Sequence, residues 1–137
     1  MRSLRDRLGL HELQLHGSEA PATLAGLLPR AYKAVRIGSA EDAKAAEDWT
    51  GETLLVDAMV DGELGGTGAA FDWRLVRGLS RARRVILAGG LTPENVRTAI
   101  DIAEPYGVDV ASGVEITGEP RRKDEAKMRA FIESARR

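Results

Sequence analysis

The 137-residue sequence contains no cysteine, few aromatic residues and almost no excess charge of either sign. Without cysteine, the chain has no disulfide, no thiolate nucleophile and no Cys-based metal site. A net charge of -1 provides no general attraction to nucleic acid or to an anionic membrane surface. No apolar run approaches the roughly 20 residues of a membrane span, and the charged N-terminal segment lacks a secretory core. These absences predict a cytoplasmic protein that binds neither nucleic acid nor membrane.

The length and the even composition predict a single domain over residues 1–137. Short apolar runs suited to buried strands alternate with segments of helical periodicity. The expected strands are Glu12–Leu15, Ala31–Ile37, Thr53–Ala58, Arg84–Ala88 and Val108–Ser112. The expected helices are Met1–Leu8, Ala20–Leu28, Ala40–Trp49, Phe71–Leu79, Thr92–Ile102 and about Lys123–Ala135. This alternation predicts a parallel sheet, either open and doubly wound or a segment of a (β/α)8 barrel.

Two glycine-bearing loops follow consecutive predicted strands. Gly89-Gly90 precedes the Thr92 helix start, and Ser112-Gly113 ends the next strand. Glycine lets an anion approach backbone N–H groups closely, and both α/β architectures place their sites at the carboxyl ends of strands. Tight turns alone would explain one such loop. Two in succession favour a phosphate site.

Three other side chains at strand ends are candidates for chemistry or binding. Asp57 closes the apolar run LLVD and is suited to general acid work, with loop anchoring as the alternative. His16 would bind substrate or act as an acid, unless it is structural. Asp109 would face the site or accept backbone N–H bonds. The glycine-rich stretch Gly62–Gly68 lacks the GK[ST] ending of a P-loop, so it does not indicate nucleotide binding.

Five longer motifs follow one another along the chain. They are LQLHG at Leu13–Gly17, LLVDA at Leu54–Ala58, GGTG-x-x-FDW at Gly65–Trp73, ILAGGLTPENV at Ile86–Val96 and GVDVASGVE at Gly107–Glu115. Together they resemble the phosphoribosylanthranilate isomerase family, and Lys123-Asp124 matches the KD that precedes its last helix. The resemblance extends from about Leu8 to the end of the chain.

The resemblance implies a (β/α)8 barrel enzyme of tryptophan biosynthesis. Its reaction would be the Amadori rearrangement of N-(5-phosphoribosyl)anthranilate, a small phosphorylated sugar derivative, to the 1-deoxyribulose 5-phosphate product, with no cofactor and no metal. Asp57 would be the catalytic residue, as the general acid that protonates the ring oxygen. The expected substrate-binding residues are Gln14, His16, Gly66, Gly68, Gly89, Gly90, Asp109, Ser112 and Gly113, with the Gly65–Gly68 loop covering the substrate.

The sequence also departs from the family pattern. The family's first strand carries a KICG motif whose Cys is the general base, and its second strand carries an Arg near the anthranilate carboxylate. Neither segment occurs here. The sequence therefore predicts a partial TIM barrel of strands four to eight, with the N-terminal three strand units missing. Loss of one proton-transfer partner costs about 10²–10⁴ in rate, so the chain alone is expected to be inactive or weak.

Exposed sheet edges are the second consequence of a partial barrel. Unpaired strand edges promote association, so we expect a homo-oligomer or a complementing N-terminal fragment. The alternative function is a non-catalytic phosphate-binding or scaffold α/β module.

Overall fold

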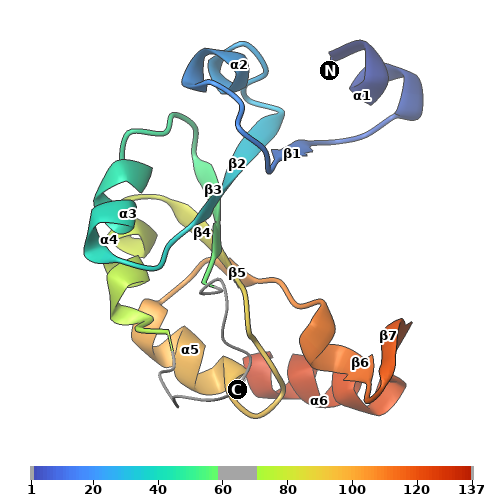
Figure 1. Cartoon of the computed structure of the whole chain (residues 1–137). Helices are drawn as coiled ribbons and strands as arrows, with labels where there is room; N and C mark the ends of the chain where they lie inside the picture. Colours follow the sequence, from blue (N-terminus) through green and yellow to red (C-terminus); the bar gives the residue numbers. More distant parts are fainter. Residues whose placement is uncertain (1, 59–70, 137) are drawn as a thin grey trace.

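A parallel sheet forms the centre of the computed structural model, which describes residues 2–58 and 71–136 (Figure 1). Its five strands lie in the order in which they occur in the chain. Every neighbouring pair is parallel, as the sequence predicted. The strands are β1 (Leu13–Leu15), β2 (Ala31–Arg36), β3 (Thr53–Asp57), β4 (Arg84–Ala88) and β5 (Gly107–Val108).

Helices connect the strands and end the chain. They are α1 (Arg2–Leu8), α2 (Pro21–Ala25), α3 (Ala40–Ala46), α4 (Arg74–Ala82), α5 (Val96–Ala103) and α6 (Glu125–Arg136), with a 3₁₀ turn η1 (Ser112–Val114). Strand β5 is shorter than predicted, and Ser112 lies in η1 instead of a strand. Within the described residues, no helix is both long enough and apolar enough to span a membrane.

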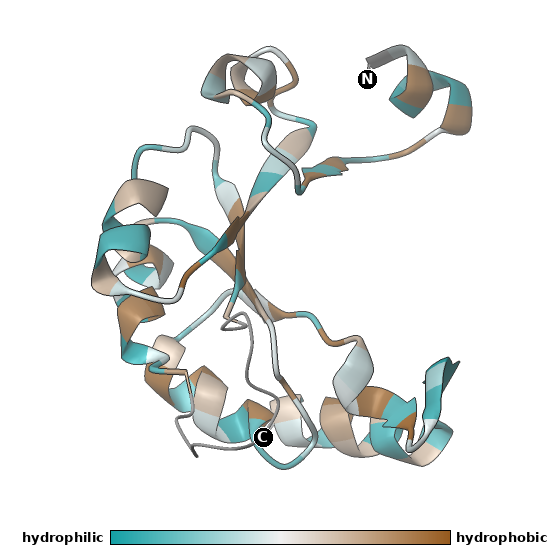
Figure 2. Ribbon diagram, in the orientation of Figure 1, coloured by the Kyte–Doolittle hydropathy of each residue, from teal (hydrophilic) through white to brown (hydrophobic). Residues whose placement is uncertain are grey.

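One face of the sheet is covered by helices, and we call it the covered face. Its side chains include Leu54, Val56, Val85 and Leu87, all fully buried, which pack with residues of α3, α4, α5 and α6. Leu15 and Ala31 of the same face pack against α2. Figure 2 shows hydrophobic colour concentrated along these central strands.

The opposite face, which we call the open face, carries a separate small cluster. Ala34, Leu55 and Ala88 are buried there, with Tyr32 and Ile86 packed beside them. All of these residues come from strands, so no described helix contributes to this cluster. A doubly wound sheet would carry helices on both faces, so that alternative is wrong. Helices on one face and strands in sequential order are the winding of a (β/α) barrel.

Hydrogen bonds from backbone amides to side chains mark the starts of three helices. Ser39 caps α3, because its hydroxyl accepts the Asp42 amide and the Asp42 carboxylate accepts the Ser39 amide. Helix α4 begins later than predicted, at Arg74, since the Asp72 carboxylate accepts the Arg74 amide at 3.0 Å. Helix α6 also begins later, because Asp124 accepts two amides of its first turn.

The sequence did not predict the antiparallel hairpin of β6 (Glu115–Ile116) and β7 (Glu119–Lys123). Its turn includes Gly118, whose φ of +82° is a conformation that favours glycine. The basic segment Arg121–Lys123 forms part of the exposed strand β7 of this hairpin.

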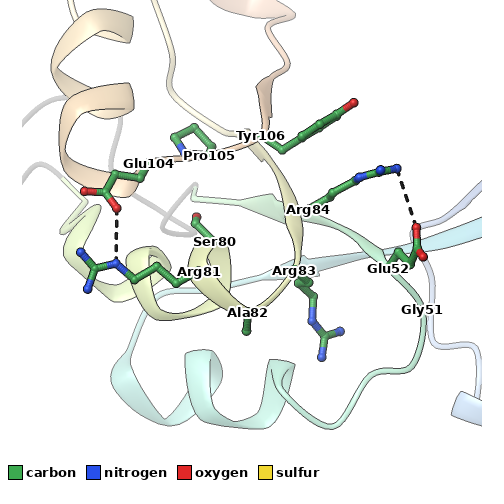
Figure 3. Close-up of a pocket in the computed structure, with 10 residues that line it drawn as sticks. All are labelled: Gly51, Glu52, Ser80, Arg81, Ala82, Arg83, Arg84, Glu104, Pro105 and Tyr106. Carbon is green, nitrogen blue, oxygen red and sulfur yellow. Dashed lines mark hydrogen bonds and ion pairs between the residues drawn. The ribbon is translucent and has the colours of Figure 1, made fainter.

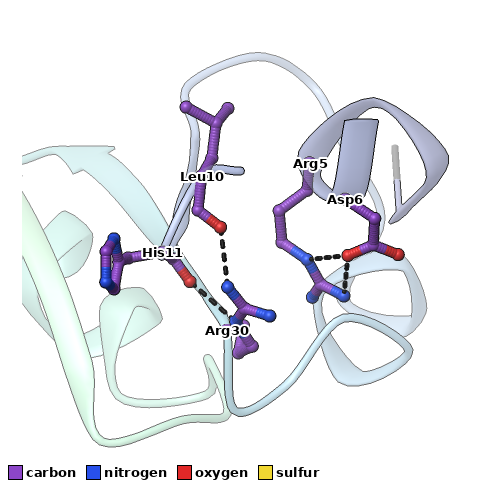
Figure 4. Close-up of polar contacts among 5 residues, drawn as sticks. All are labelled: Arg5, Asp6, Leu10, His11 and Arg30. Atoms are coloured by element: carbon purple, nitrogen blue, oxygen red, sulfur yellow. Dashed lines mark hydrogen bonds and ion pairs between the residues drawn. The ribbon is translucent and has the colours of Figure 1, made fainter. Parts of the chain in front are cut away.

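Helix α1 lies apart from the sheet, joined to β1 by an extended segment (Figure 1). Arg30 fastens this segment: its Nε donates to the His11 carbonyl at 2.9 Å and its Nη2 donates to the Leu10 carbonyl at 2.7 Å (Figure 4). Leu4 and Leu8 of the helix and Leu10 after it are exposed. None of these three leucines therefore belongs to the buried core on the covered face of the sheet.

Candidate active site

The carboxyl ends of the strands surround a cavity of about 280 Å³. The predicted site residues that line it are Gln14, His16, Asp57, Gly89, Gly90, Asp109 and Ser112. Gly113 does not line it. The predicted residues Gly66 and Gly68 lie outside the described part of the chain. Residues from four separate strand ends thus meet in one place, because parallel strands bring their carboxyl ends to the same edge.

Asp57 ends β3 on the open face and is half-buried. The register of β2 and β3 pairs it with Arg36. The pair two residues earlier in each strand, Ala34 and Leu55, also lies on this face. Arg36 was missed by the sequence analysis, although alternation along Ala31–Arg36 places it on the same face as Tyr32 and Ala34. Arg36 is therefore the residue of the neighbouring strand that is paired with the candidate acid.

The loop after β4 is braced by Asn95, a second residue that the sequence analysis did not assign. Its Oδ1 accepts the Thr92 amide at 2.8 Å, and its Nδ2 donates to the Gly90 carbonyl at 2.9 Å. Helix α5 consequently begins only at Val96. The turn before it had been predicted as the first residues of a helix over Thr92–Ile102. Gly89 and Gly90 have φ values of +87° and +61°, which L side chains rarely adopt.

Gly113 joins this loop to the loop after β5. A Cβ built on Gly113 would lie 1.8 Å from the carbonyl oxygen of Leu91 and 3.2 Å from the Cα of Thr92. Only a residue without a side chain permits that approach. The sequence predicted Gly113 as a phosphate contact, and its visible role is to let the two loops pack backbone against backbone.

Lys123 holds the loop after β5 from the other side. Its ammonium donates to the Ala111 carbonyl at 2.8 Å and to Glu115 Oε1 at 2.9 Å. This contact, together with backbone amide bonding, keeps the pKa of Glu115 below its usual value. Ala111 lines the cavity next to Ser112, so the Lys123-Asp124 motif both supports the candidate phosphate loop and starts α6.

The β1 side of the cavity carries Gln14 and His16. The Tyr32 hydroxyl donates to Gln14 Oε1 at 3.2 Å. Burial, with smaller contributions from the carboxylates of Glu12 and Asp109, raises the pKa of Tyr32, so this hydroxyl stays protonated. His16 also lines a second cavity of about 680 Å³, which Arg36 lines as well, so His16 borders both cavities.

Another cavity of about 680 Å³ lies at the opposite end of the sheet, between the amino ends of β4 and β5 (Figure 3). Four of its charged groups form two pairs, Arg81 with Glu104 and Arg84 with Glu52, and Arg83 donates to the carbonyls of Trp49 and Glu47. Sites of (β/α) barrels lie at the carboxyl ends of strands, where catalytic residues gather. We therefore assign the candidate site to the smaller cavity. In the described residues, no cluster of three His, Asp or Glu side chains is arranged to hold a metal ion.

Comparison with known proteins decides the family. A sequence profile of N-(5'-phosphoribosyl)anthranilate isomerase matches residues 1–134. The chain belongs to the phosphoribosylanthranilate isomerase family. The isomerase of Moorella thermoacetica is 48% identical over 130 residues, which are 93% of this chain and 57% of that protein. The chain thus spans less than two thirds of this relative's length.

Solved structures of the family show the same arrangement of elements. The crystal structure of phosphoribosylanthranilate isomerase from Thermotoga maritima superposes with a TM-score of 0.83 at 35% identity, over 98% of this chain and 66% of that one. A second Thermotoga maritima structure, described as monomers generated from a dimeric phosphoribosylanthranilate isomerase, gives a TM-score of 0.79 at 32% identity, over 98% and 65% of the two chains. The predicted family is confirmed.

Proposed function

We propose that this chain supplies the general acid and the phosphate loops of a phosphoribosylanthranilate isomerase. The observation that carries the proposal is the 280 Å³ cavity, which brings Asp57 and the two glycine-bearing loops together at the carboxyl ends of the strands. The gathering of these motifs follows from the sheet topology, and it holds independently of the family match.

Each part of the cavity has a chemical task in this proposal. The carboxyl group of Asp57 donates its proton to the ribose ring oxygen as the bond from C1 to that oxygen breaks. The phosphate lies against the loops that contain Gly90 and Ser112, where backbone amides supply partial positive charge. Gln14 and His16 line the β1 side. The later removal of the C2 proton needs a base, and this chain contains no cysteine to provide it.

We further propose that residues 1–137 form strands four to eight of the barrel as a single domain. Strand β1 and strand β5 are the edges of the sheet, and each would pair with a strand from outside the described chain. The pairing partner is a second copy or a fragment with the family's first three strand–helix units. Light scattering of the chain alone tests self-association, and a monomer at micromolar concentration excludes the second copy.

The activity test measures the fluorescence change on conversion of N-(5-phosphoribosyl)anthranilate, with the chain alone and with the added fragment. We expect weak or no turnover alone and turnover with the fragment. Asp57→Asn should then lower kcat by about 10²–10⁴. The control is Asp101→Asn, which removes an exposed α5 carboxylate paired with Arg97.

Two outcomes would count against the proposal. Full turnover by Asp57→Asn would remove Asp57 from the acid role. Saturable binding of inorganic phosphate with no turnover in either mixture would favour a non-catalytic phosphate-binding module.

A further inference from the structure

Lys33 is the one charged residue that is buried among the described residues. It lies on the covered face of β2, and its side chain is 6% exposed. Its Nζ donates to the Gly17 carbonyl at 2.5 Å and to Glu19 Oε2 at 2.7 Å. The ring of Trp49 lies 5.2 Å from the same nitrogen. A buried ammonium is costly unless it is paired and hydrogen-bonded, and this one is both.

Glu19 closes the contact from the other side. Its two carboxylate oxygens accept the Gly17 amide at 3.0 and 3.2 Å. The hydrogen bond from Lys33, followed by backbone amide bonding, lowers the pKa of the Glu19 carboxyl, so the carboxylate remains charged at neutral pH. Lys33 and Glu19 thus occupy both the donor and the acceptor of Gly17, and we call these three residues the Gly17 clasp.

The Gly17 clasp acts on His16 through the backbone. The Gly17 N–H belongs to the rigid peptide plane between His16 and Gly17, while the Gly17 carbonyl belongs to the next plane. Glu19 restrains the first plane through the Gly17 amide, and Lys33 restrains the next plane through the Gly17 carbonyl while also holding the Glu19 carboxylate. A restrained first plane limits ψ of His16, and thereby the backbone conformation from which its side chain leaves the end of β1. A Cβ on Gly17 would lie 3.1 Å from Glu19 Oε1, so the clasp also leaves little room for a larger residue there.

We propose that Lys33 is a positioning residue, which directs the His16 imidazole into the carboxyl-end cavity by holding the Gly17 peptide groups from the covered face of the sheet. The claim that this orientation of His16 serves substrate binding rests on the proposed function. The claim that Lys33 orients His16 does not, because it concerns contacts within the chain. His16 then depends on a side chain that never enters the cavity.

The test is NMR spectroscopy of the chain without substrate. The chain contains two histidines, and His11, which precedes β1, serves as the internal reference. In Lys33→Met, the His16 imidazole signals should shift, and the Gly17 amide should exchange with solvent roughly tenfold faster or more. The His11 signals should not move. The matched control is Lys44→Met, which breaks a lysine–glutamate pair of 2.6 Å on α3 whose lysine is 79% exposed.

A folded Lys33→Met chain with unchanged His16 signals and unchanged Gly17 exchange would overturn the proposal. If Lys33→Met does not fold, Glu19→Ala decides in its place, since Glu19 is partly exposed and its loss frees the same Gly17 amide. Unchanged His16 signals in Glu19→Ala overturn the proposal equally.

A measurement of enzyme activity tests whether the Gly17 clasp matters for catalysis. In the mixture with the added fragment, Lys33→Met should lower kcat/KM by roughly tenfold, because small displacements of a site residue are costly in rate. Lys44→Met should leave it unchanged. Absence of turnover in the wild-type mixture contradicts the proposed function and leaves the NMR result standing.

Discussion

The two faces of the sheet use the same five strands for different purposes. On the covered face, Leu54, Val56, Val85 and Leu87 are fully buried beneath helices. On the open face, the buried residues are fewer and include two alanines. At the carboxyl ends of the strands, polar side chains line the cavity on this face. Burial of apolar area supplies most of the folding free energy. Stability is therefore concentrated on the covered face, which leaves the open face available for a site.

The largest expected effect follows from truncating neighbouring residues that point to opposite faces. Leu87→Ala should lower the free energy of unfolding by about 2–5 kcal/mol, since it leaves a cavity beneath the helices. Ile86→Ala, on the half-buried open face, should cost less than half as much. Urea denaturation of both variants measures the difference. Equal losses would contradict the division between the faces.

An intermediate effect on stability is expected from a substitution where the loop after β4 packs against the loop after β5. Gly113→Ala places a methyl group against the Leu91 carbonyl, and overpacking of this kind costs about 1–3 kcal/mol. Because the loops must separate, inorganic phosphate should also bind more weakly. Gly107→Ala is the control, since nothing lies within 4 Å of its added Cβ. Calorimetry and a phosphate titration test both statements. Wild-type phosphate affinity in Gly113→Ala would show that the packed loops do not form the phosphate site.

The smallest expected effect is on the loss of stability as the pH falls. The pKa values of Glu19 and Glu115 are lowered in the folded chain, mainly by Lys33 and Lys123. Both contributions are fully present above the ordinary carboxyl value of 4.5 and are lost as the pH falls through the lowered values. Melting temperatures between pH 6 and pH 3 should therefore fall less steeply in Glu19→Gln. An unchanged slope would show that this carboxylate adds nothing to the stability of its loop.

Much of the fold was predictable from patterns of hydrophobicity. The Val- and Leu-rich runs around Leu54 and Leu87 indicated strands of a parallel sheet, and the structure confirms them. The helix predicted from Ala40 also begins at Ala40 in the structure, directly after its cap Ser39. Periodicity alone left two windings open, because it does not say on which side each crossover helix lies. The resemblance to the family favoured the barrel winding, and the helices on one face of the sheet agree with it.

Several predicted site residues lie together, whereas the residues that support them were not predicted. Asp57, His16, Gly89 and Gly90 are residue types suited to acid chemistry or to anion binding, and they line one cavity. Lys33 and Asn95 act through hydrogen bonds to backbone groups far away in sequence or across a turn. Such partners are set by tertiary geometry, so a linear pattern does not reveal them.

The sequential order of the strands also has a kinetic consequence. Every strand of the five-stranded sheet pairs only with strands adjacent in the chain, and a described helix lies between each successive pair of these strands. Closing short loops costs little chain entropy, so the native contacts can form one unit after another. A chain organised in this way should assemble by extension from any unit already formed, instead of waiting for its two ends to meet.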